Sequence, residues 1–222
     1  MRLIMKTVVI FDMDGVILDT ERLVQICWKI ISEETGYPDL CDMIKQGMGA
    51  DRPSRIRLLK ERYGDDFPAE ELLNESSRIF HEKFDGSIPA KDGARELLEY
   101  LSAGGYRLAL ASSTRKQIVE KELADVDLLK YFEEVICGDM VTHSKPDPEI
   151  FLLAARKLGA DPTDCYVVED SYNGIRAAYA ADMHPIMVPD QLQPDEEMKA
   201  LAEFIVPSLA DVQKLAAAGS LK

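Results

Sequence analysis

Short runs of apolar, β-branched residues recur along the chain and alternate with segments that have helical periodicity. Thr7–Phe11 is such a run, and similar runs follow at Arg107–Ala111, Val135–Cys137, Cys165–Val168 and Pro185–Val188. Continuous apolar runs predict strands that are buried on both faces. Strands that alternate with helices predict a parallel sheet covered by helices on both sides. The sequence thus predicts an α/β fold.

A long helical stretch interrupts this alternation early in the chain. Between about residues 19 and 88 no strand is expected, and the periodicity predicts helices over Glu21–Thr35, Asp51–Tyr63 and Pro68–Phe84. The alternation then resumes, with helices expected at Ala94–Leu101, Gln117–Leu123, Ile150–Leu158 and Ile175–Ala181 and a closing helix at Leu209–Ala218. We therefore expect an α/β core domain of residues 1–18 and 89–222, interrupted by a helical domain of residues 19–88.

The net charge limits the partners that this chain can have. The formal charge is −14, from 26 basic and 40 acidic side chains among 222 residues. Such a surface repels nucleic acid and anionic membranes, which bind clustered Lys and Arg. It also repels an anionic substrate, unless a cation or local basic groups reverse the field at the site. We expect a small-molecule partner, and we take a monomer as the default state.

The cysteine pattern and the hydropathy indicate the cellular compartment of the protein. Cys27, Cys41, Cys137 and Cys165 are scattered, without a C-x-x-C pair or histidines at metal-binding spacing, which is typical of free thiols in a reducing compartment. Met1–Lys6 leads into an apolar run that is too short for a signal peptide, and no stretch approaches the roughly 20 apolar residues of a membrane span. We expect a cytoplasmic protein.

Two acids follow the first predicted strand, at the sheet edge where parallel α/β proteins bind ligands. Asp12 and Asp14 can share a cation there, or they can divide the roles of nucleophile and proton carrier if their environments separate their pKa values. The alternative is a turn, because Asp14-Gly15 between apolar runs favours a hairpin. The two interpretations are compatible, since a turn would present both carboxylates.

Hydroxyl groups follow the second predicted strand. Ser112, Ser113 and Thr114 stand before Arg115 and Lys116, at the expected start of a helix. Free backbone N–H groups, hydroxyls and cations at one place suit a phosphate group. The alternative is plain helix capping by Ser113 or Thr114.

A lysine follows the third predicted strand. Lys145 precedes Pro146 and an expected helix start, with Asp147 as the N-cap and Pro148 in the first turn. Most lysines are solvated surface residues. One held beside a strand end is instead well placed to neutralise a phosphate and nearby carboxylates.

Two adjacent acids, Glu169 and Asp170, follow the fourth predicted strand. Buried acids are costly without a partner, and a hard cation is a natural one. Capping of the next helix by Ser171 or Asn173 is the alternative, but a cap alone does not require Glu169.

Taken in order, these clusters resemble the signature motifs of a known superfamily. Asp12-Met13-Asp14-Gly15-Val16, Ser112, Lys145-Pro146-Asp147-Pro148 and Glu169-Asp170 look like the four motifs of the haloacid dehalogenase-like superfamily. The spacing and the helical insertion resemble the branch that includes β-phosphoglucomutase and sugar-phosphate phosphatases. The resemblance implies a Rossmann-like parallel sheet core with a mobile, all-helical cap domain.

The resemblance also implies a reaction. Asp12 would attack phosphorus and form an aspartyl-phosphate, while Asp14 would protonate the leaving alcohol and then activate water. One Mg²⁺ ion is implied, with Asp12, the backbone carbonyl of Asp14, and Asp170 with Glu169 beside it as its candidate ligands. The implied phosphate-binding residues are Ser112 and Lys145, with Ser113 as a further candidate.

The same branch contains phosphatases and mutases, and two positions favour a phosphatase. β-Phosphoglucomutases carry a histidine in the first cap helix, where this chain has Val24. They also carry an arginine in a cap loop that corresponds to Gly47-Met48-Gly49-Ala50, where Ala50 takes its place. Hydrolysis of a small phosphate ester, such as a sugar phosphate, is therefore favoured over the mutase reaction.

The cap is expected to select the substrate, and Arg52 is the residue that we predict to contact it. Arg52 or Arg55 could replace the missing arginine only with a register shift. Otherwise Arg55 and His81 are typical of solvated side chains, and Met48 of packing.

Two other classes remain open. A receiver-type signalling domain also uses acids, a hydroxyl, a lysine and Mg²⁺, but it is short and lacks a helical insertion. A non-catalytic sugar-phosphate-binding module would not need both Asp12 and Asp14.

Overall fold

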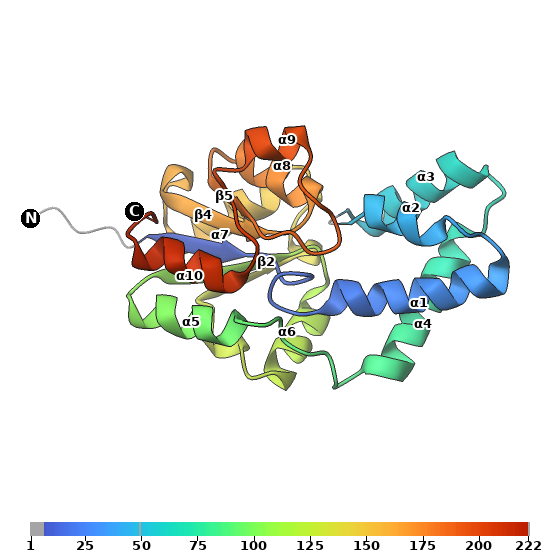
Figure 1. The fold of residues 1–222 in the computed structure, drawn as a ribbon, viewed down its shortest axis with the longest axis horizontal. Helices are drawn as coiled ribbons and strands as arrows, with labels where there is room; N and C mark the ends of the chain where they lie inside the picture. The colour runs from blue at the N-terminus through green and yellow to red at the C-terminus, as the bar shows by residue number, and fades with distance from the viewer. Residues whose placement is uncertain (1–6, 49, 222) are drawn as a thin grey trace, which may run out of the picture.

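The computed structural model describes residues 7–48 and 50–221. The opening segment Met1–Lys6, the loop residue Gly49 and the terminal Lys222 lie outside the described residues. Figure 1 shows a sheet flanked by helices on one side of the molecule and a separate group of helices, α1 to α4, on the other.

The sheet is parallel and has six strands in the order β3-β2-β1-β4-β5-β6. The strands are β1 (Val8–Phe11), β2 (Arg107–Ser112), β3 (Glu134–Cys137), β4 (Cys165–Glu169), β5 (His184–Met187) and β6 (Phe204–Ile205). The five predicted strands and the α/β fold class are confirmed. The two-residue β6 was not predicted, because so short a segment carries no periodic signal.

Helices cover both faces of the sheet, as the buried strands predict. The helices of the core are α5 (Ala94–Ala103), α6 (Lys116–Asp125), α7 (Glu149–Leu158), α8 (Tyr172–Ala180), α9 (Glu196–Leu201) and α10 (Leu209–Ala217). Val9 and Phe11 pack with α5, α6 and α10 on one face, and Val8 and Ile10 pack with α7 and α8 on the other (Figure 1). Short 3₁₀ turns stand at Leu129–Tyr131, Gly138–Met140 and Pro162–Asp164.

The inserted segment is entirely helical over the described residues and has a hydrophobic core of its own. It consists of α1 (Thr20–Thr35), α2 (Leu40–Gln46), α3 (Arg52–Tyr63) and α4 (Ala69–Phe84). Trp28, Ile31, Leu40 and Leu59 are among its buried residues, in a cluster distinct from those of the sheet. The helix α2 was not predicted, because its seven residues are too few for a clear amphipathic period.

The two connections between these parts run side by side. Leu18 and Ala90 form an antiparallel bridge, and the N–H of Asp19 donates to the carbonyl of Pro89 at 3.0 Å. The Lys91 ammonium lies 3.6 Å from Asp19 and 2.9 Å from Asp190, so it joins both connections to the loop after β5. The domain boundaries at residues 18/19 and 88/89 remain a prediction, and these contacts are where a hinge would lie.

Candidate active site

Asp12 and Asp14 stand in a tight loop at the end of β1. The loop is closed by bonds from the N–H groups of Ile17 and Leu18 to the carbonyl of Met13, each 2.9 Å long. Gly15 has a positive φ of 80°, and a Cβ there would lie only 2.3 Å from an Asp170 oxygen. A glycine is therefore required, and the turn and the paired carboxylates are features of the same loop.

Lys145 is buried at the centre of the site, with a side chain that is 1% exposed. Its ammonium donates to Asp12 at 2.5 Å, to Glu169 at 2.7 Å and to the carbonyl of Ala111 at 3.1 Å. Burial alone would lower the pKa of Lys145, but the two carboxylates outweigh burial and raise it above its ordinary value. The lysine is therefore held charged beside Asp12.

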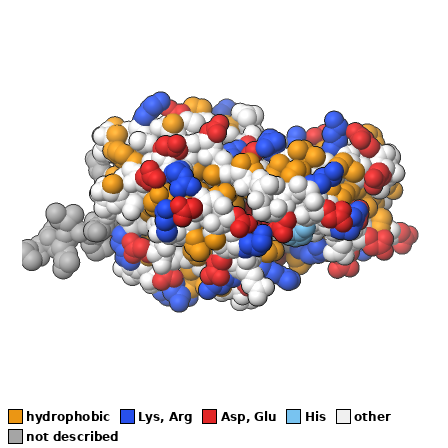
Figure 2. Space-filling model, turned by 90° about the horizontal axis from the view of Figure 1, so that it is seen from below, with side chains coloured by type: hydrophobic (Ala, Val, Ile, Leu, Met, Phe, Trp, Pro, Cys, Tyr) orange, Lys and Arg blue, Asp and Glu red, His pale blue; other side chains and the backbone are white. Residues whose placement is uncertain are grey.

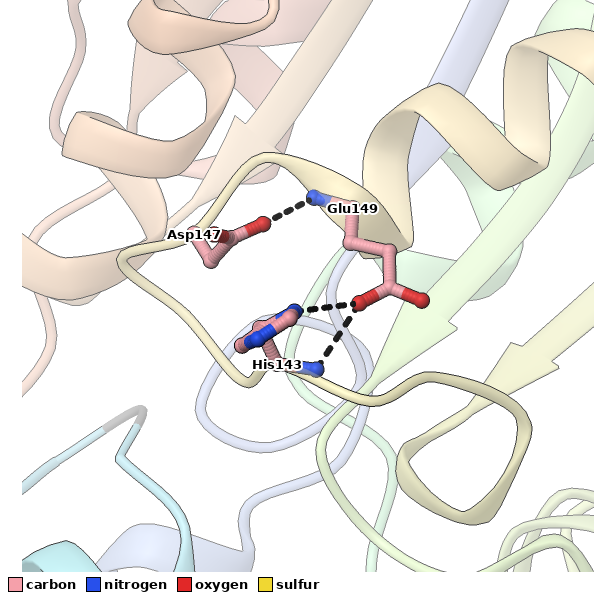
Figure 3. Close-up of side chains that lie close together, drawn as sticks. All are labelled: His143, Asp147 and Glu149. Carbon is pink, nitrogen blue, oxygen red and sulfur yellow. Dashed lines mark hydrogen bonds and ion pairs between the residues drawn. The ribbon is translucent and has the colours of Figure 1, made fainter.

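The loop that carries Lys145 is fixed by a small polar cluster (Figure 3). The Glu149 carboxylate accepts the N–H of His143 at 2.8 Å and that of Thr142 at 3.0 Å, and these bonds lower its pKa. The ring of His143 contacts the same carboxylate, and Asp147 accepts the N–H of Glu149 at 2.9 Å. Pro148, not Asp147, immediately precedes α7, so the predicted helix start was wrong by one residue. The cluster anchors the turn on which Lys145 stands.

The hydroxyl cluster after β2 points to Asp14. Ser112 donates to the Asp14 carboxylate at 3.2 Å and Thr114 at 3.1 Å, while the N–H of Thr114 donates to the Ser112 hydroxyl at 3.1 Å. The helix α6 begins at Lys116, whose N–H donates to the Asp139 carboxylate at 3.1 Å, and Arg115, not Ser113 or Thr114, stands at the N-cap position. Thr20 of α1 adds a third hydroxyl, 2.8 Å from Asp14, and this contact was not predicted.

Glu169 and Asp170 have different environments although they are adjacent. Glu169 accepts bonds from Lys145, from the N–H groups of Asp170 and Ser171 and from the Ser171 hydroxyl, and a Cβ on Gly174 would collide with it at 1.8 Å. Ser171 also caps α8, so that alternative is confirmed and coexists with the buried acids. The metal role predicted for Glu169 stays a prediction, since its carboxylate holds the lysine and the loop.

The Asp170 carboxylate, unlike that of Glu169, lacks a polar partner among the described residues. Asp170 is 4% exposed, and no hydrogen bond or ion pair reaches its carboxylate within residues 7–48 and 50–221. Burial raises its pKa well above the ordinary value, and the charges of Glu169, Glu21 and Asp12 raise it further. Burial likewise raises the pKa of Asp12, although Lys145 opposes this shift.

These residues fit a divalent cation. Asp12, Asp14 and Asp170 line one cavity of about 150 Å³, and Lys145 is the one cation that forms an ion pair with any of the three among the described side chains, through Asp12. Buried carboxylates in excess of their counter-charges are stabilised by a metal ion, and an all-oxygen donor set suits a hard cation. Asp12 and Asp170 would hold the ion by their side chains, and the backbone at Asp14 stands beside them.

The wall opposite these acids comes from the helical insertion. Glu21, Val24, Met48, Ala50 and Arg55 all line the cavity. Burial, followed by the charge of Asp14, raises the pKa of Glu21 to about 8, while Arg55 opposes this shift. The Nε of Arg55 is buried without a hydrogen-bond partner in the described part of the chain. The expectation that Arg55 is a solvated charge was therefore wrong, because its helix register turns it inward.

Arg52, the predicted substrate residue, lies farther out. It lines a larger cleft of about 680 Å³ that lies between the insertion and the core and also borders Asp14. Its guanidinium donates to Asn74 at 2.6 Å and to the carbonyl of Glu70 at 3.1 Å, both on α4. The substrate contact of Arg52 remains a prediction, and His81 lies in the same cleft.

A parallel sheet that gathers acids, hydroxyls and a buried lysine at its carboxyl edge defines an α/β enzyme suited to phosphate groups. The model of the haloacid dehalogenase-like hydrolases matches residues 9–188 of this chain. The chain belongs to this family, and the resemblance of the four motifs is confirmed.

Individual relatives agree with this assignment. The chain is 36% identical over 181 residues to the phosphorylated carbohydrates phosphatase of Thermotoga maritima, which covers 80% of this chain and 82% of that protein. It is 35% identical over 208 residues to a Drosophila melanogaster protein named a probable pseudouridine-5′-phosphatase, covering 91% and 89%. The structure of CbbY from Rhodobacter sphaeroides in complex with phosphate matches with a TM-score of 0.74 at 26% identity, covering 94% and 96%. The chain is a phosphatase of this family.

Within the described residues, no helix is both long and apolar enough to cross a bilayer.

Proposed function

We propose that this phosphatase is a Mg²⁺-dependent enzyme that hydrolyses a small sugar phosphate through an aspartyl-phosphate on Asp12. The observation that carries the proposal is the convergence of Asp12, Asp14, Lys145 and Asp170 at one sheet edge. These residues come from three separate parts of the sequence. Asp12, Asp14 and Asp170 line one cavity, and the Asp170 carboxylate has no hydrogen-bond partner within residues 7–48 and 50–221. Relatives that act on phosphorylated carbohydrates support the substrate class.

Asp12 is the proposed nucleophile. Its carboxylate oxygen would form a bond to phosphorus while the bond from phosphorus to the alcohol oxygen breaks. Lys145, at 2.5 Å, favours the ionised form that attack requires and would neutralise the phosphoryl oxygens in the transition state. A bound Mg²⁺ would supply further positive charge for the phosphoryl group.

Asp14 is the proposed proton carrier. It would donate a proton to the departing alcohol oxygen and then accept one from the water that attacks the phosphorus of the intermediate. Ser112, Thr114 and Thr20 hold its carboxylate in place, each through a hydroxyl within 3.2 Å. Ser112 and Ser113 are also proposed to contact phosphoryl oxygens when substrate is present.

Hydrolysis is proposed in preference to the mutase reaction. Val24 and Ala50 line the cavity where a mutase of this branch would carry a histidine and an arginine. Retention of a second phosphate group is therefore poorly supported at these positions. We also propose that residues 19–88 act as a lid that closes over a bound phosphate ester and that partners are small molecules, because the chain is acidic. Lys and Arg side chains are interspersed with Asp and Glu on the face shown in Figure 2, without one basic patch there.

A generic aryl phosphate tests this proposal. We expect multiple turnovers with Mg²⁺, none after chelation, and a loss of at least about 10³-fold in kcat for Asp12→Asn with the fold intact. Labelling of the protein without turnover would favour a receiver-type domain, and no reaction from a folded sample would favour a binding module. Product analysis with β-glucose 1-phosphate separates phosphatase from mutase, since a mutase would yield glucose 6-phosphate.

A further inference from the structure

Glu122 is a buried acid that the proposed reaction does not use. It stands on α6, between Val119 and Leu123, which pack against the sheet, and it is itself only 7% exposed. No hydrogen bond or ion pair reaches its carboxylate from any residue in 7–48 or 50–221. A carboxylate buried to this degree is normally paired.

The rest of α6 shows how unusual this is. Glu120 faces solvent and lies 3.6 Å from Lys116, and Asp125 lies 3.1 Å from Lys121. Lys121 also contacts Asp85 on the insertion, at 3.0 Å. The acids on both sides of Glu122 thus have partners, and Glu122 does not.

Glu122 borders a cavity. Glu122 lines the cleft of about 680 Å³ between the core and the insertion, together with Asp14. Asn74, Ser76 and Ser77 of α4 line the same cleft from the insertion. Glu122 is thus a polar group from the core in a cleft that also has amide and hydroxyl groups on the insertion side.

The larger cleft lies where the leaving alcohol of the proposed reaction would extend. In the proposed function Asp14 protonates the oxygen of the leaving alcohol, so the body of the leaving group extends into space that Asp14 borders. The small cavity at Asp12 and Asp170 holds about 150 Å³ and suits the phosphoryl group and a cation, whereas the larger cleft has room for the rest of the molecule.

We propose that Glu122 is a specificity-determining residue that hydrogen-bonds a hydroxyl group of the leaving alcohol. This inference rests on the proposed function and names what that site selects, which is a polyhydroxylated phosphate ester over an apolar ester of similar size. A carboxyl group accepts a hydrogen bond from a hydroxyl in either protonation state, and a ligand bonded to Glu122 and to Ser76 or Ser77 would bridge core and insertion. A ligand without a hydroxyl at this position forgoes the hydrogen bond, so Glu122 adds nothing to its binding.

Burial changes the pKa of the Glu122 carboxyl group in a way that agrees with the geometry. It raises the pKa of Glu122 to about 8, with a further increase from the charge of Asp14. Lys121 opposes the shift, and Asp85 and Asp125 add to it. The carboxyl group is therefore held in a dry, electronegative setting in which a hydroxyl donor is favourable.

The test compares Glu122→Ala with Glu120→Ala, a surface acid on the same helix. Each is assayed with 4-nitrophenyl phosphate and with ribose 5-phosphate, glucose 6-phosphate, fructose 1-phosphate and sorbitol 6-phosphate. For the best sugar or polyol phosphate we expect Glu122→Ala to lower kcat/KM about 10- to 100-fold, mainly through KM. The aryl phosphate should change less than about twofold, and Glu120→Ala should leave both substrates unchanged.

A deoxy analogue of the best substrate distinguishes a hydrogen bond between Glu122 and the substrate from a general structural effect of the substitution. One deoxy analogue, lacking the hydroxyl that meets Glu122, should react equally well with the wild-type protein and with Glu122→Ala. Equal losses on sugar and aryl phosphates, or no loss on either, would overturn the inference. Failure of the wild-type protein to turn over 4-nitrophenyl phosphate would instead count against the proposed function, and it is seen before any variant is compared.

Discussion

The two sides of the active site differ in how completely their polar groups are satisfied. On the core side, Lys145, Glu169 and Asp14 are held by bonds of 2.5–3.2 Å from several elements. On the opposite wall and in the outer cleft, Arg55 has a buried Nε without a partner, and no hydrogen bond among the described residues reaches Glu122. The satisfied side suits chemistry that needs fixed geometry, and the unsatisfied side suits a ligand that arrives with its own polar groups.

Lys145→Met is expected to have the largest effect. It tests the core side of the site, where the polar groups are hydrogen-bonded. It leaves Asp12 and Glu169 buried without their cation, and we expect the free energy of unfolding to fall by about 3–5 kcal/mol. Turnover should fall by about 10²–10³-fold, because charge on the phosphoryl group is no longer neutralised. Urea unfolding and steady-state kinetics measure these effects, and a variant of unchanged stability would show that the contacts are not formed in solution.

Asp170→Asn sharpens the comparison, since Asp170 stands at the sheet edge beside satisfied groups and has no hydrogen-bond partner among the described residues. Loss of even an indirect metal contact costs about 10- to 100-fold in affinity, so the Mg²⁺ concentration for half-maximal activity should rise at least as much. Without metal, removal of a buried unpaired charge should stabilise the protein by about 1 kcal/mol or more. Thermal unfolding with and without Mg²⁺ checks both, and a variant that Mg²⁺ still stabilises as it does the wild-type protein would contradict the role.

Glu122→Gln tests the unsatisfied side through pH. Because the folded protein raises the pKa of Glu122 from 4.5 to about 8, it binds this proton more tightly than the unfolded chain does. The resulting stability is present below about pH 4.5 and is lost as the pH rises toward 8. Glutamine does not titrate, so the stability of the variant has no contribution of this kind that varies with pH. Above about pH 8 the free energy of unfolding of the variant should exceed that of the wild-type protein by on the order of 3 kcal/mol.

The free energy of unfolding, measured for the metal-free wild-type protein and for Glu122→Gln between pH 5 and 9, gives this difference directly. The charges of Asp14, Lys121, Asp85 and Asp125 act on position 122 in both proteins, so the comparison isolates the substituted carboxyl group. A stability difference that does not vary with pH would show that Glu122 is solvated.

Arg52 and Arg55 give the smallest expected effect. The sequence analysis favoured Arg52 as the selecting residue, and the structure offers Arg55 as a rival because it lines the inner cavity. We expect Arg55→Ala to lower kcat/KM about 10-fold for a sugar phosphate and Arg52→Ala less than about threefold, since Arg52 is bonded to α4. The reverse order in the same substrate panel would restore the original assignment.

The sequence predicted the satisfied side far better than the unsatisfied one. Asp12, Ser112 and Asp170 stand at or directly after the ends of β1, β2 and β4, and Lys145 lies on the loop that follows β3. Strands of one parallel sheet end at one edge, so chain order alone brings these four residues together. The hydrogen bonds of Thr20 and Thr114 to Asp14 were missed, because a hydroxyl near a helix start also reads as a cap or a linker.

The wall from the insertion and the outer cleft could not be predicted in the same way. Arg55 and Glu122 belong to helices, and their role depends on which face each helix turns to the other domain. Periodicity assigns an inward face to apolar residues, so a buried Glu on α6 carries no signal in a single sequence. The short elements α2, α9 and β6 were not predicted for a simpler reason, because each spans too few residues to show a hydrophobic period.

The direct test of the account is to find the phosphoryl group on the protein. Acid quench of the enzyme during turnover of a sugar phosphate with Mg²⁺, followed by peptide mass spectrometry, should show one added phosphoryl group on the peptide that contains Asp12. The adduct should be absent from Asp12→Asn and from chelated enzyme. A phosphoryl group found only on another residue, or turnover by Asp12→Asn at the wild-type rate, would contradict it.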